Sequence, residues 1–394
     1  MWKQFKSGNE QNDDPAKWAA MIPARPLTLL IMGFTLSLQA QAQDAQAPVP
    51  AERTAAAVAD PDWEVGHFSW GDPNLEGTFT SRDMSGIPME RPSQYGTREN
   101  LTDEEFRQRY NSGPGGLASL RAGEEFEGEA RLQLSALDSS EVGTRTFGYT
   151  SYIIDPPDGR MPALTEEGER RRAANRRGQA NGPFFTPDDF SYYDRCISRG
   201  VTGSILPSLY GDAMRIVQSP NAVAITYEML HDTRIIPLDS AALPDPEIQQ
   251  YMGASIGHFE GDTLVVETRN LTDQLSFARM MHSEDAVLTE RFTRIDPDMI
   301  NYSATIDDAR TFERPWTFRA TLTTQPDYEV LEYSCHEGNF FIANALRAEK
   351  RFQESVAAAI ANGEPVPERS TDGGGTSIYV APSSEEAVDI NAGQ

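Results

Sequence analysis

The sequence predicts a mainly β protein: an antiparallel up-and-down barrel, lipocalin- or calycin-like in shape, wrapped by a long N-terminal extended segment and followed by a C-terminal helix. Three observations predict this fold. Runs of β-type residues follow one another from about residue 212, tight-turn sequences separate neighbouring runs, and the chain before them is rich in turns but poor in helix signals. Strands joined by short turns pair antiparallel, and closing them into a barrel removes exposed sheet edges.

The first residues have the pattern of an export signal. Arg25 precedes an apolar run from Leu27 to Leu38, which is too short to cross a bilayer, and the small-x-small pattern Ala40-Gln41-Ala42 follows. Residues 1–42 are therefore predicted to be a signal peptide, with Met1 or Met21 as the start. We expect a periplasmic or secreted protein without a membrane anchor.

The next part of the chain is predicted to wrap the barrel. Residues 43–62 are rich in Ala, Pro and Gln and predict a disordered leader. Residues 63–211 predict a wrapping segment with short helices, one capped by Thr102 and another capped by Thr165.

Residues 212–362 are predicted to form the barrel and the final helix. Eight β-type runs occur there: AMRIVQSP, AVAITYEMLHDTRIIPL, ASIGHFEG, DTLVVETRNL, AVLTERFTRID, MINYSATIDD, WTFRATLTTQ and EVLEYSCHEG. Tight turns separate four neighbouring pairs, at Ser219-Pro220-Asn221, Glu260-Gly261-Asp262, Asp296-Pro297-Asp298 and Gln325-Pro326-Asp327. An amphipathic pattern from Asn339 to about Asn362 predicts the helix, and residues 363–394 predict a disordered tail.

Composition limits the classes of partner. Lys and Arg number 34 against 60 Asp and Glu, which gives a formal net charge of -26. Nucleic acids and anionic membranes repel such a polyanion, so neither is expected as a partner. A hydrophobic content of 39% suffices for a core. With nucleic acids and anionic membranes excluded, a small molecule is the expected substrate or ligand. The oligomeric state cannot be predicted from the sequence.

The two cysteines are predicted to form a disulfide. Cys196 in DRCISRG and Cys335 in YSCHEGN are the only cysteines of an exported chain. In an oxidising compartment an even number of cysteines favours a bridge over free thiols. The bridge would fasten the wrapping segment to the barrel.

Several motifs together resemble a known family. They are GDPNLEG, MERP, DPPDGRMPALT, DRCI, QSPNAVAITYEMLHDTRIIPLD, MGASIGHFEGDTLVVETRN, ERFTRID, RPWTF and EYSCHEGN, and they span roughly residues 70 to 350. In this series the chain is similar to a family of largely uncharacterised secreted proteins of Gram-negative bacteria. The resemblance implies an exported single domain and assigns no catalytic residue.

Alternation sorts the last predicted strands into two faces, because successive side chains of a strand point to opposite sides. The apolar face includes Ile300, Tyr302, Ala304, Ile306, Trp316, Phe318, Ala320, Leu322, Leu331, Tyr333 and Cys335, and the polar face includes Asn301, Ser303, Thr305, Asp307, Thr317, Arg319, Thr321, Glu332, Ser334 and His336. Two arrangements remain open. Either the apolar face fills the lumen and the polar face is solvated, or the lumen is polar and the wrapping segment covers the apolar face.

A polar lumen would bring candidate catalytic residues together. Glu228, His231, Glu332 and His336 are the candidates for proton transfer, which needs one ionised and one protonated group. Tyr227, Arg234 and Arg319 are the candidates for substrate binding. A structural Glu–Arg pair in a partly buried barrel is the alternative interpretation.

No metal or other cofactor is predicted. The five histidines show neither H-x-H nor H-E-x-x-H spacing, and the chain has no C-x-x-C. A metal site would need His231, His258 and His336 to meet from neighbouring strands.

Three functions follow from these patterns. The first is an exported acid–base enzyme, a lyase, isomerase or hydrolase, acting on a small organic molecule in a barrel pocket. The second is a periplasmic lipocalin-like binding protein for a hydrophobic ligand, which the apolar face favours. The third is a metal-dependent hydrolase.

Overall fold

The computed structural model describes most of the chain between residues 62 and 368. The described ranges are 62–111, 147–175, 183–207, 211–238, 242–274, 276–277, 280–325 and 328–368. The predicted signal peptide, nearly all of the predicted leader and most of the predicted tail lie outside them. Every described residue belongs to one compact unit, residues 46–394.

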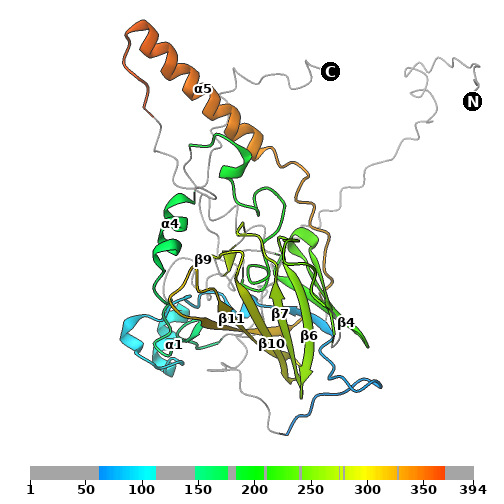
Figure 1. The fold of residues 1–394 in the computed structure, drawn as a ribbon. Coiled ribbons are helices and arrows are strands. Elements are labelled where there is room, and N and C mark those ends of the chain that lie inside the picture. Colours follow the sequence, from blue (N-terminus) through cyan, green and yellow to red (C-terminus); the bar gives the residue numbers. More distant parts are fainter. Residues whose placement is uncertain are drawn as a thin grey trace, which may run out of the picture. The chain divides into compact units, whose positions relative to one another are not determined.

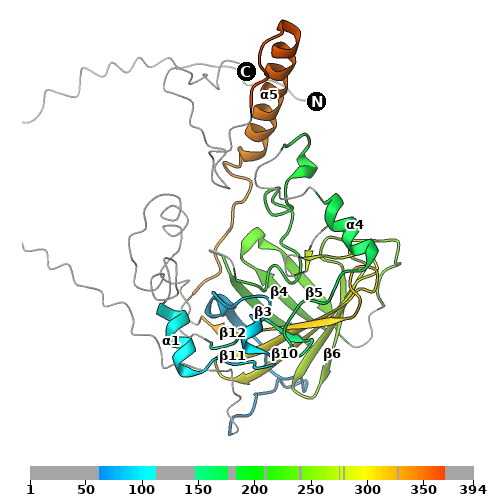
Figure 2. The same cartoon turned by 90° about the vertical axis from the view of Figure 1, so that its left-hand side faces the viewer.

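Antiparallel strands curl into a nearly closed barrel (Figure 1, Figure 2), which confirms the predicted fold class. The strand order around it is β5-β4-β3-β1-β12-β11-β10-β7-β6. The strands are β1 (Gly77–Thr80), β3 (Ala213–Ser219), β4 (Ala222–Tyr227), β5 (Thr233–Pro237), β6 (Ala254–Glu260), β7 (Thr263–Arg269), β10 (Val287–Asp296), β11 (Met299–Asp307) and β12 (Trp316–Thr324). The short strand β2 (Ile153–Asp155) pairs with β12, and β8 (Ser276–Phe277) pairs with β9 (Met280–Met281) in a separate ribbon.

The barrel has a seam between β5 and β6. Nine strands that alternate in direction leave the two end strands parallel, because nine is odd. Along the seam, the described residues form one parallel bridge, between Leu238 and Gly257. The Arg234 side chain spans the same seam, since its Nη2 donates to Ser255 Oγ on β6 at 3.1 Å. Closure therefore depends on side chains where the backbone ladder is incomplete.

The wrapping segment contributes a barrel strand of its own. β1 lies between β12 and β3, with Phe79 opposite Thr324 on one side and Met214 on the other. The predicted boundary at residue 211 is therefore not the start of the barrel. Four residues are too few to show a period of two, so the sequence pattern did not mark this strand.

The helices agree with their capping signals. In α1 (Asp103–Asn111), Thr102 Oγ1 accepts from the Glu105 amide at 3.3 Å and Glu105 Oε2 accepts from the Thr102 amide at 2.8 Å. In α4 (Glu166–Ala174), Thr165 Oγ1 accepts from the Gly168 amide. The final helix is α5 (Phe341–Asn362), and the short 3₁₀ turns are η2 (Arg82–Met84), η3 (Ser93–Tyr95), η5 (Pro187–Asp189) and η6 (Met229–His231).

One predicted run is two strands joined by a hairpin. The stretch TYEMLHDTR turns through η6, where Leu230 and His231 have positive φ angles of 64° and 44°. The prediction of a single β-type run is therefore wrong beyond Tyr227, the last residue of β4. The turn separates Glu228 from Arg234 on β5.

The eighth predicted run is not a strand. Residues 328–340 are irregular, with Leu331 56% exposed and Glu332 and His336 exposed. Both edges of β12, where this run was expected to pair, are occupied: β11 lies on one side, and β1 and β2 lie on the other. No edge remains there for a further strand.

The apolar face fills the barrel. Inward side chains of the barrel strands join one buried cluster, and the largest of them on β11 and β12, Tyr302, Trp316 and Phe318, are at most 1% exposed. Asn301 is exposed and Ser303 is half-buried on the opposite face. Of the two arrangements left open by the sequence, the apolar lumen is correct, and the polar lumen is wrong.

The motifs MERP and DPPDGR form one structural contact in the wrapping segment. Arg91 is 1% exposed, and its guanidinium donates to Thr150 Oγ1 at 2.9 Å and to the Pro157 carbonyl at 2.6 Å. Gly159 turns over it with φ +68°, and a Cβ there would lie 2.8 Å from the Arg91 side chain. These signature residues hold the segment in place.

Replacing Gly159 with Ala is expected to destabilise the protein. The alanine would adopt a left-handed backbone conformation, which lowers stability by about 1–2 kcal/mol for a residue with a Cβ. Its Cβ would also clash with the buried Arg91 side chain. The midpoint of urea unfolding reports the change. Gly261→Ala is the matched control, because Gly261 shares the positive φ (+59°) but has nothing within 4 Å of the added Cβ. Equal losses in both variants would show that the Arg91 contact adds nothing.

Candidate functional site

The barrel lumen holds a buried ion pair. The Arg234 side chain is 4% exposed and Glu290 is fully buried, and both Arg234 Nη atoms donate to the Glu290 carboxylate, Nη1 at 3.1 Å. Tyr302 donates to Glu290 Oε1 at 3.1 Å, and Thr268 Oγ1 accepts from Arg234 Nη2 at 3.0 Å. This network satisfies both charges within the core.

The surroundings shift the pKa values of Arg234, Tyr227 and Tyr302. Burial alone would lower the pKa of Arg234, but the Glu290 carboxylate outweighs it and raises that pKa. Burial raises the pKa of Tyr227 to about 12 and the pKa of Tyr302 well above its ordinary value. Both phenols therefore keep their protons at neutral pH. Tyr227 and Arg234, predicted to bind substrate, are instead closed inside the core.

The predicted catalytic residues do not form one site. Glu228 is buried and accepts a hydrogen bond from the Tyr328 hydroxyl at 2.8 Å. His231 is exposed, with its Nδ1 3.2 Å from the Tyr333 carbonyl oxygen. The Glu332 carboxylate and the His336 ring are exposed and form no hydrogen bond or ion pair with any described residue. Their predicted convergence in a polar lumen is wrong, because the lumen is apolar and residues 328–340 are not a strand.

The described histidines offer no metal site. His258 lies on β6 with its Nε2 3.2 Å from Glu260 Oε1. Among the described residues, no three His, Cys, Asp or Glu side chains form a group suited to a metal ion.

A serine, a histidine and an aspartate meet beside β11, but not as a nucleophile and its base. Ser283 Oγ donates to Asp308 Oδ1 at 2.7 Å, and His282 Nδ1 lies 2.9 Å from the Ser283 carbonyl oxygen. Burial opposes the charge of Asp308, but hydrogen bonds from Thr311 and Ser283 outweigh it and lower its pKa. Burial also lowers the pKa of His282. The hydroxyl donates its one proton to Asp308 and not to the imidazole, so the aspartate anchors a loop and the contact between nucleophile and base that catalysis requires is not made.

Cys196 and Cys335 form the predicted disulfide, with their Cα atoms 5.7 Å apart. Tyr193 and Tyr333 bring their hydroxyls within 3.2 Å beside it, and Asn339 Nδ2 donates to the Asp194 carbonyl at 2.9 Å. The bridge joins the wrapping segment to residues 328–340, and it fits an oxidising compartment.

Within the described part of the chain, none of the helices is both long and apolar enough to cross a bilayer.

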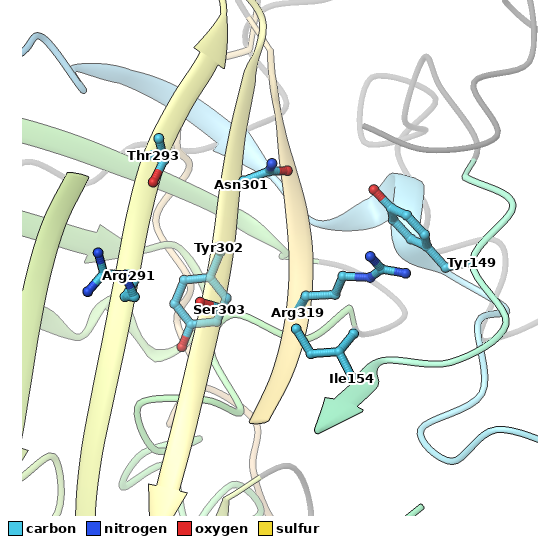
Figure 3. A pocket seen from close by; sticks show the side chains of 8 residues that line it. All are labelled: Tyr149, Ile154, Arg291, Thr293, Asn301, Tyr302, Ser303 and Arg319. Atoms are coloured by element: carbon cyan, nitrogen blue, oxygen red, sulfur yellow. The ribbon is translucent and has the colours of Figure 1, made fainter. Parts of the chain in front are cut away.

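A polar cleft lies on the outer face of β10, β11 and β12. Its volume is about 260 Å³, at or below the lower end of small-molecule sites. It is lined by Tyr149, Ile154, Arg291, Thr293, Asn301, Tyr302, Ser303 and Arg319 (Figure 3). Tyr149 and Ile154 come from the wrapping segment, which thus forms one wall.

Strand register builds the floor of the cleft. Arg291 pairs with Ser303 across β10 and β11, and Ser303 pairs with Arg319 across β11 and β12. The two arginines therefore flank Ser303 in one row, and Asn301 is two residues from it on the same face. Figure 3 shows Arg319 running toward Tyr149 and Arg291 pointing away on the other side.

Each arginine of the cleft already has a carboxylate partner. Arg291 Nη2 donates to Glu260 Oε2 at 2.9 Å, and Arg319 Nη1 donates to Glu99 Oε2 at 2.9 Å. The Arg319 guanidinium also lies 3.9 Å from the centre of the Tyr149 ring. Such a cation–π contact orients the guanidinium as well as stabilising it.

Several donors of the cleft are not used within the described structure. Arg319 Nε is buried and has no hydrogen-bond partner there. The side chains of Ser303 and Asn301 likewise form no hydrogen bond with a described residue. Unused donors beside a guanidinium suit a ligand rich in acceptor oxygens.

Comparison with known proteins adds no functional assignment. Family models, curated proteins and solved structures were each compared with the chain, and none matched.

Of the predicted site residues, Arg319 alone lines this cleft. Arg291 was missed because the sequence does not show that β10 and β11 pair in the register that places Arg291 in the same row as Arg319. Tyr149 and Ile154 were missed because their contact with the barrel is made by a segment without a regular pattern. The polar face predicted for β11 and β12 was the signal that pointed to Asn301 and Ser303.

Proposed function

We propose that this protein is an exported binding protein that holds a small, polar, oxygen-rich molecule in the outer cleft of β10, β11 and β12. The observation that carries the proposal is the row Arg291–Ser303–Arg319, with unused donors in a cleft of about 260 Å³. A charged group with a few polar side chains in a concave site is the usual arrangement for orienting a small ligand.

The lining favours binding over proton transfer. Its eight residues include no carboxyl or imidazole group, the side chains that most often transfer protons in catalysis. Glu228, His231, Glu332 and His336 do not lie among them. We therefore do not propose the acid–base enzyme, and the buried network of Arg234 and Glu290 gives no access to a substrate.

The lumen argues against the lipocalin-like alternative. A hydrophobic ligand would need space among Tyr302, Trp316 and Phe318, which are at most 1% exposed and in contact with the rest of the core cluster. The chain uses its aromatic residues to fill the barrel. The ligand proposed for the outer cleft is consequently polar.

The proposed location is the periplasm or the medium. Its support is the signal-like sequence ending at Ala42 together with the disulfide. Protein recovered from the periplasm or the medium is expected to begin near Gln43, because signal peptidase cuts after the small-x-small pattern. N-terminal sequencing that returned Met1 or Met21 would contradict export by this signal.

Replacing Arg319 with Met tests the binding function. Wild-type protein purified from the expressing cell without dialysis is expected to retain a bound small molecule, seen as an added mass in native mass spectrometry. The methionine of the variant keeps apolar contact with the Tyr149 ring but cannot donate hydrogen bonds, so the added mass should be lost.

The matched control is Arg314→Met, because Arg314 forms an exposed pair with Asp155 at 3.0 Å and does not line the cleft. Its bound mass should equal that of the wild type. An added mass that survives in the Arg319 variant would place the ligand elsewhere.

A further inference from the structure

Given the proposed binding function, we further propose that the ligand is a hydroxylated carboxylic acid and that the Glu99 carboxylate occupies the place of the ligand's own carboxylate. Arg319 would thus bind Glu99 and the ligand in turn. Glu99 would act as a built-in competitor, which a ligand carboxylate must displace from Arg319.

The contact between Arg319 and Glu99 is incomplete. Arg319 Nη1 donates to Glu99 Oε2 at 2.9 Å, and Nη2 reaches the Glu99 backbone carbonyl at 3.5 Å. Arg319 Nε is buried without a partner among the described residues, so Nη1 and Nη2 are the donors that an incoming carboxylate reaches. A guanidinium binds a carboxylate best through two parallel N–H bonds, so an incoming carboxylate has a better contact available than Glu99 makes.

Glu99 can leave without a change in the backbone. Its side chain is 48% exposed, and the bond to Arg319 is its only hydrogen bond within the described structure. Its backbone is held separately, because the Thr150 amide donates to the Glu99 carbonyl at 2.9 Å. Exposed ion pairs contribute little to stability, so the carboxylate can turn into solvent at small cost.

Charge favours an exchange of carboxylates. The chain carries a net charge of -26 and repels an added anion. When a ligand carboxylate takes the position of the Glu99 carboxylate, Arg319 keeps one negative partner while Glu99 moves outward. A neutral molecule does not compensate Arg319, and so it leaves Glu99 in place.

The remaining donors select the rest of the ligand. Ser303 and Asn301 lie on the floor of the cleft with side chains that no described residue uses. Ser303 and the Asn301 amide can donate to hydroxyl or carboxylate oxygens, and both can also accept from hydroxyls. A small acid with several hydroxyl groups, of the size of a sugar acid, matches this set.

The experiment compares D-glucuronate with D-glucose, which share the ring but differ in the carboxylate. The dissociation constant of each is measured by titration calorimetry for the wild type, Glu99→Gln, Glu99→Ala and Arg319→Gln. Asp155→Asn, which breaks an exposed carboxylate–arginine pair outside the cleft, is the control. Melting temperatures confirm that each variant is folded, and Glu99→Ala serves if the Gln variant is not.

The wild type should bind glucuronate more tightly than glucose. Removing the competing carboxylate in Glu99→Gln should tighten glucuronate binding about two- to fivefold, the scale of an exposed ion pair, and leave glucose binding unchanged. Arg319→Gln should weaken glucuronate binding by about tenfold or more. Asp155→Asn should match the wild type.

Two results overturn the inference while the proposed function stands. They are equal binding of glucose and glucuronate at the cleft, and glucuronate binding that Glu99→Gln weakens, which would make Glu99 a ligand contact. If neither sugar binds, the inference is overturned as well. The proposed function is then judged separately, by the bound mass in native mass spectrometry.

Discussion

Glu290→Gln is expected to lower the free energy of unfolding by about 3–5 kcal/mol, the usual result of removing one partner from a buried ion pair. Glu290 is fully buried and accepts from Arg234 and Tyr302, so the variant leaves the Arg234 charge uncompensated in the core. Equilibrium unfolding in urea measures the loss. The seam between β5 and β6 should open first, because Arg234 also holds Ser255 across it.

The double variant Arg234→Met, Glu290→Leu separates the cost of an unpaired charge from the value of the pair. Apolar residues of similar volume often replace a buried pair without loss, so much of the stability should return. Asp155→Asn, which breaks an exposed pair, should leave the melting temperature nearly unchanged. A Glu290→Gln variant as stable as the wild type would show that the ion pair does not hold the barrel together.

Replacing Cys196 and Cys335 with Ser is expected to cost about 4–5 kcal/mol, because the bridge closes a long loop in the unfolded chain. The two cysteines are 139 residues apart. Urea unfolding with and without reductant measures the effect. Reduced wild type should match the double variant, and reductant should not change the variant. A midpoint that does not respond to reductant in the wild type would contradict a stabilising bridge.

Much of the barrel could be predicted, because apolar and polar residues alternate within its long strands. Runs such as MINYSATIDD and WTFRATLTTQ alternate cleanly, and the turns at Pro220, Gly261 and Pro297 join neighbouring strands as expected. The strand β1 could not be predicted, because its four residues pair with partners more than 130 positions away. Its place beside β12 is also why EVLEYSCHEG is not a strand.

The candidate site was harder to predict because it depends on register. Asp296 pairs with Met299, but a bulge after Arg294 shifts the ladder by one residue, so Arg291 pairs with Ser303. Without the bulge, Arg291 would oppose Ala304. A shift of one residue exchanges the two faces of a strand, and no feature of ERFTRID marks the position of the bulge.

The partners of the predicted residues could not be predicted either, because they are distant in the sequence. Arg234 and Glu290 form the structural Glu–Arg pair that the sequence suggested in general terms, but with a different glutamate from the Glu228 considered there. Glu99 meets Arg319 across 220 positions of the chain. Such pairs follow from the closure of the barrel and from the path of the wrapping segment, and local patterns do not encode them.

The most direct measurement of the central claim follows the arginine Nε–H resonances in a two-dimensional ¹H–¹⁵N spectrum while D-glucuronate is added. Arg319 and Arg234 signals are assigned from Arg319→Lys and from the folded Arg234→Met, Glu290→Leu variant. Ligand binding in the outer cleft predicts that the Arg319 signal moves saturably and that the Arg234 signal, inside the lumen, stays in place. Movement of Arg234 with Arg319 unchanged would place the site in the barrel interior and contradict the account.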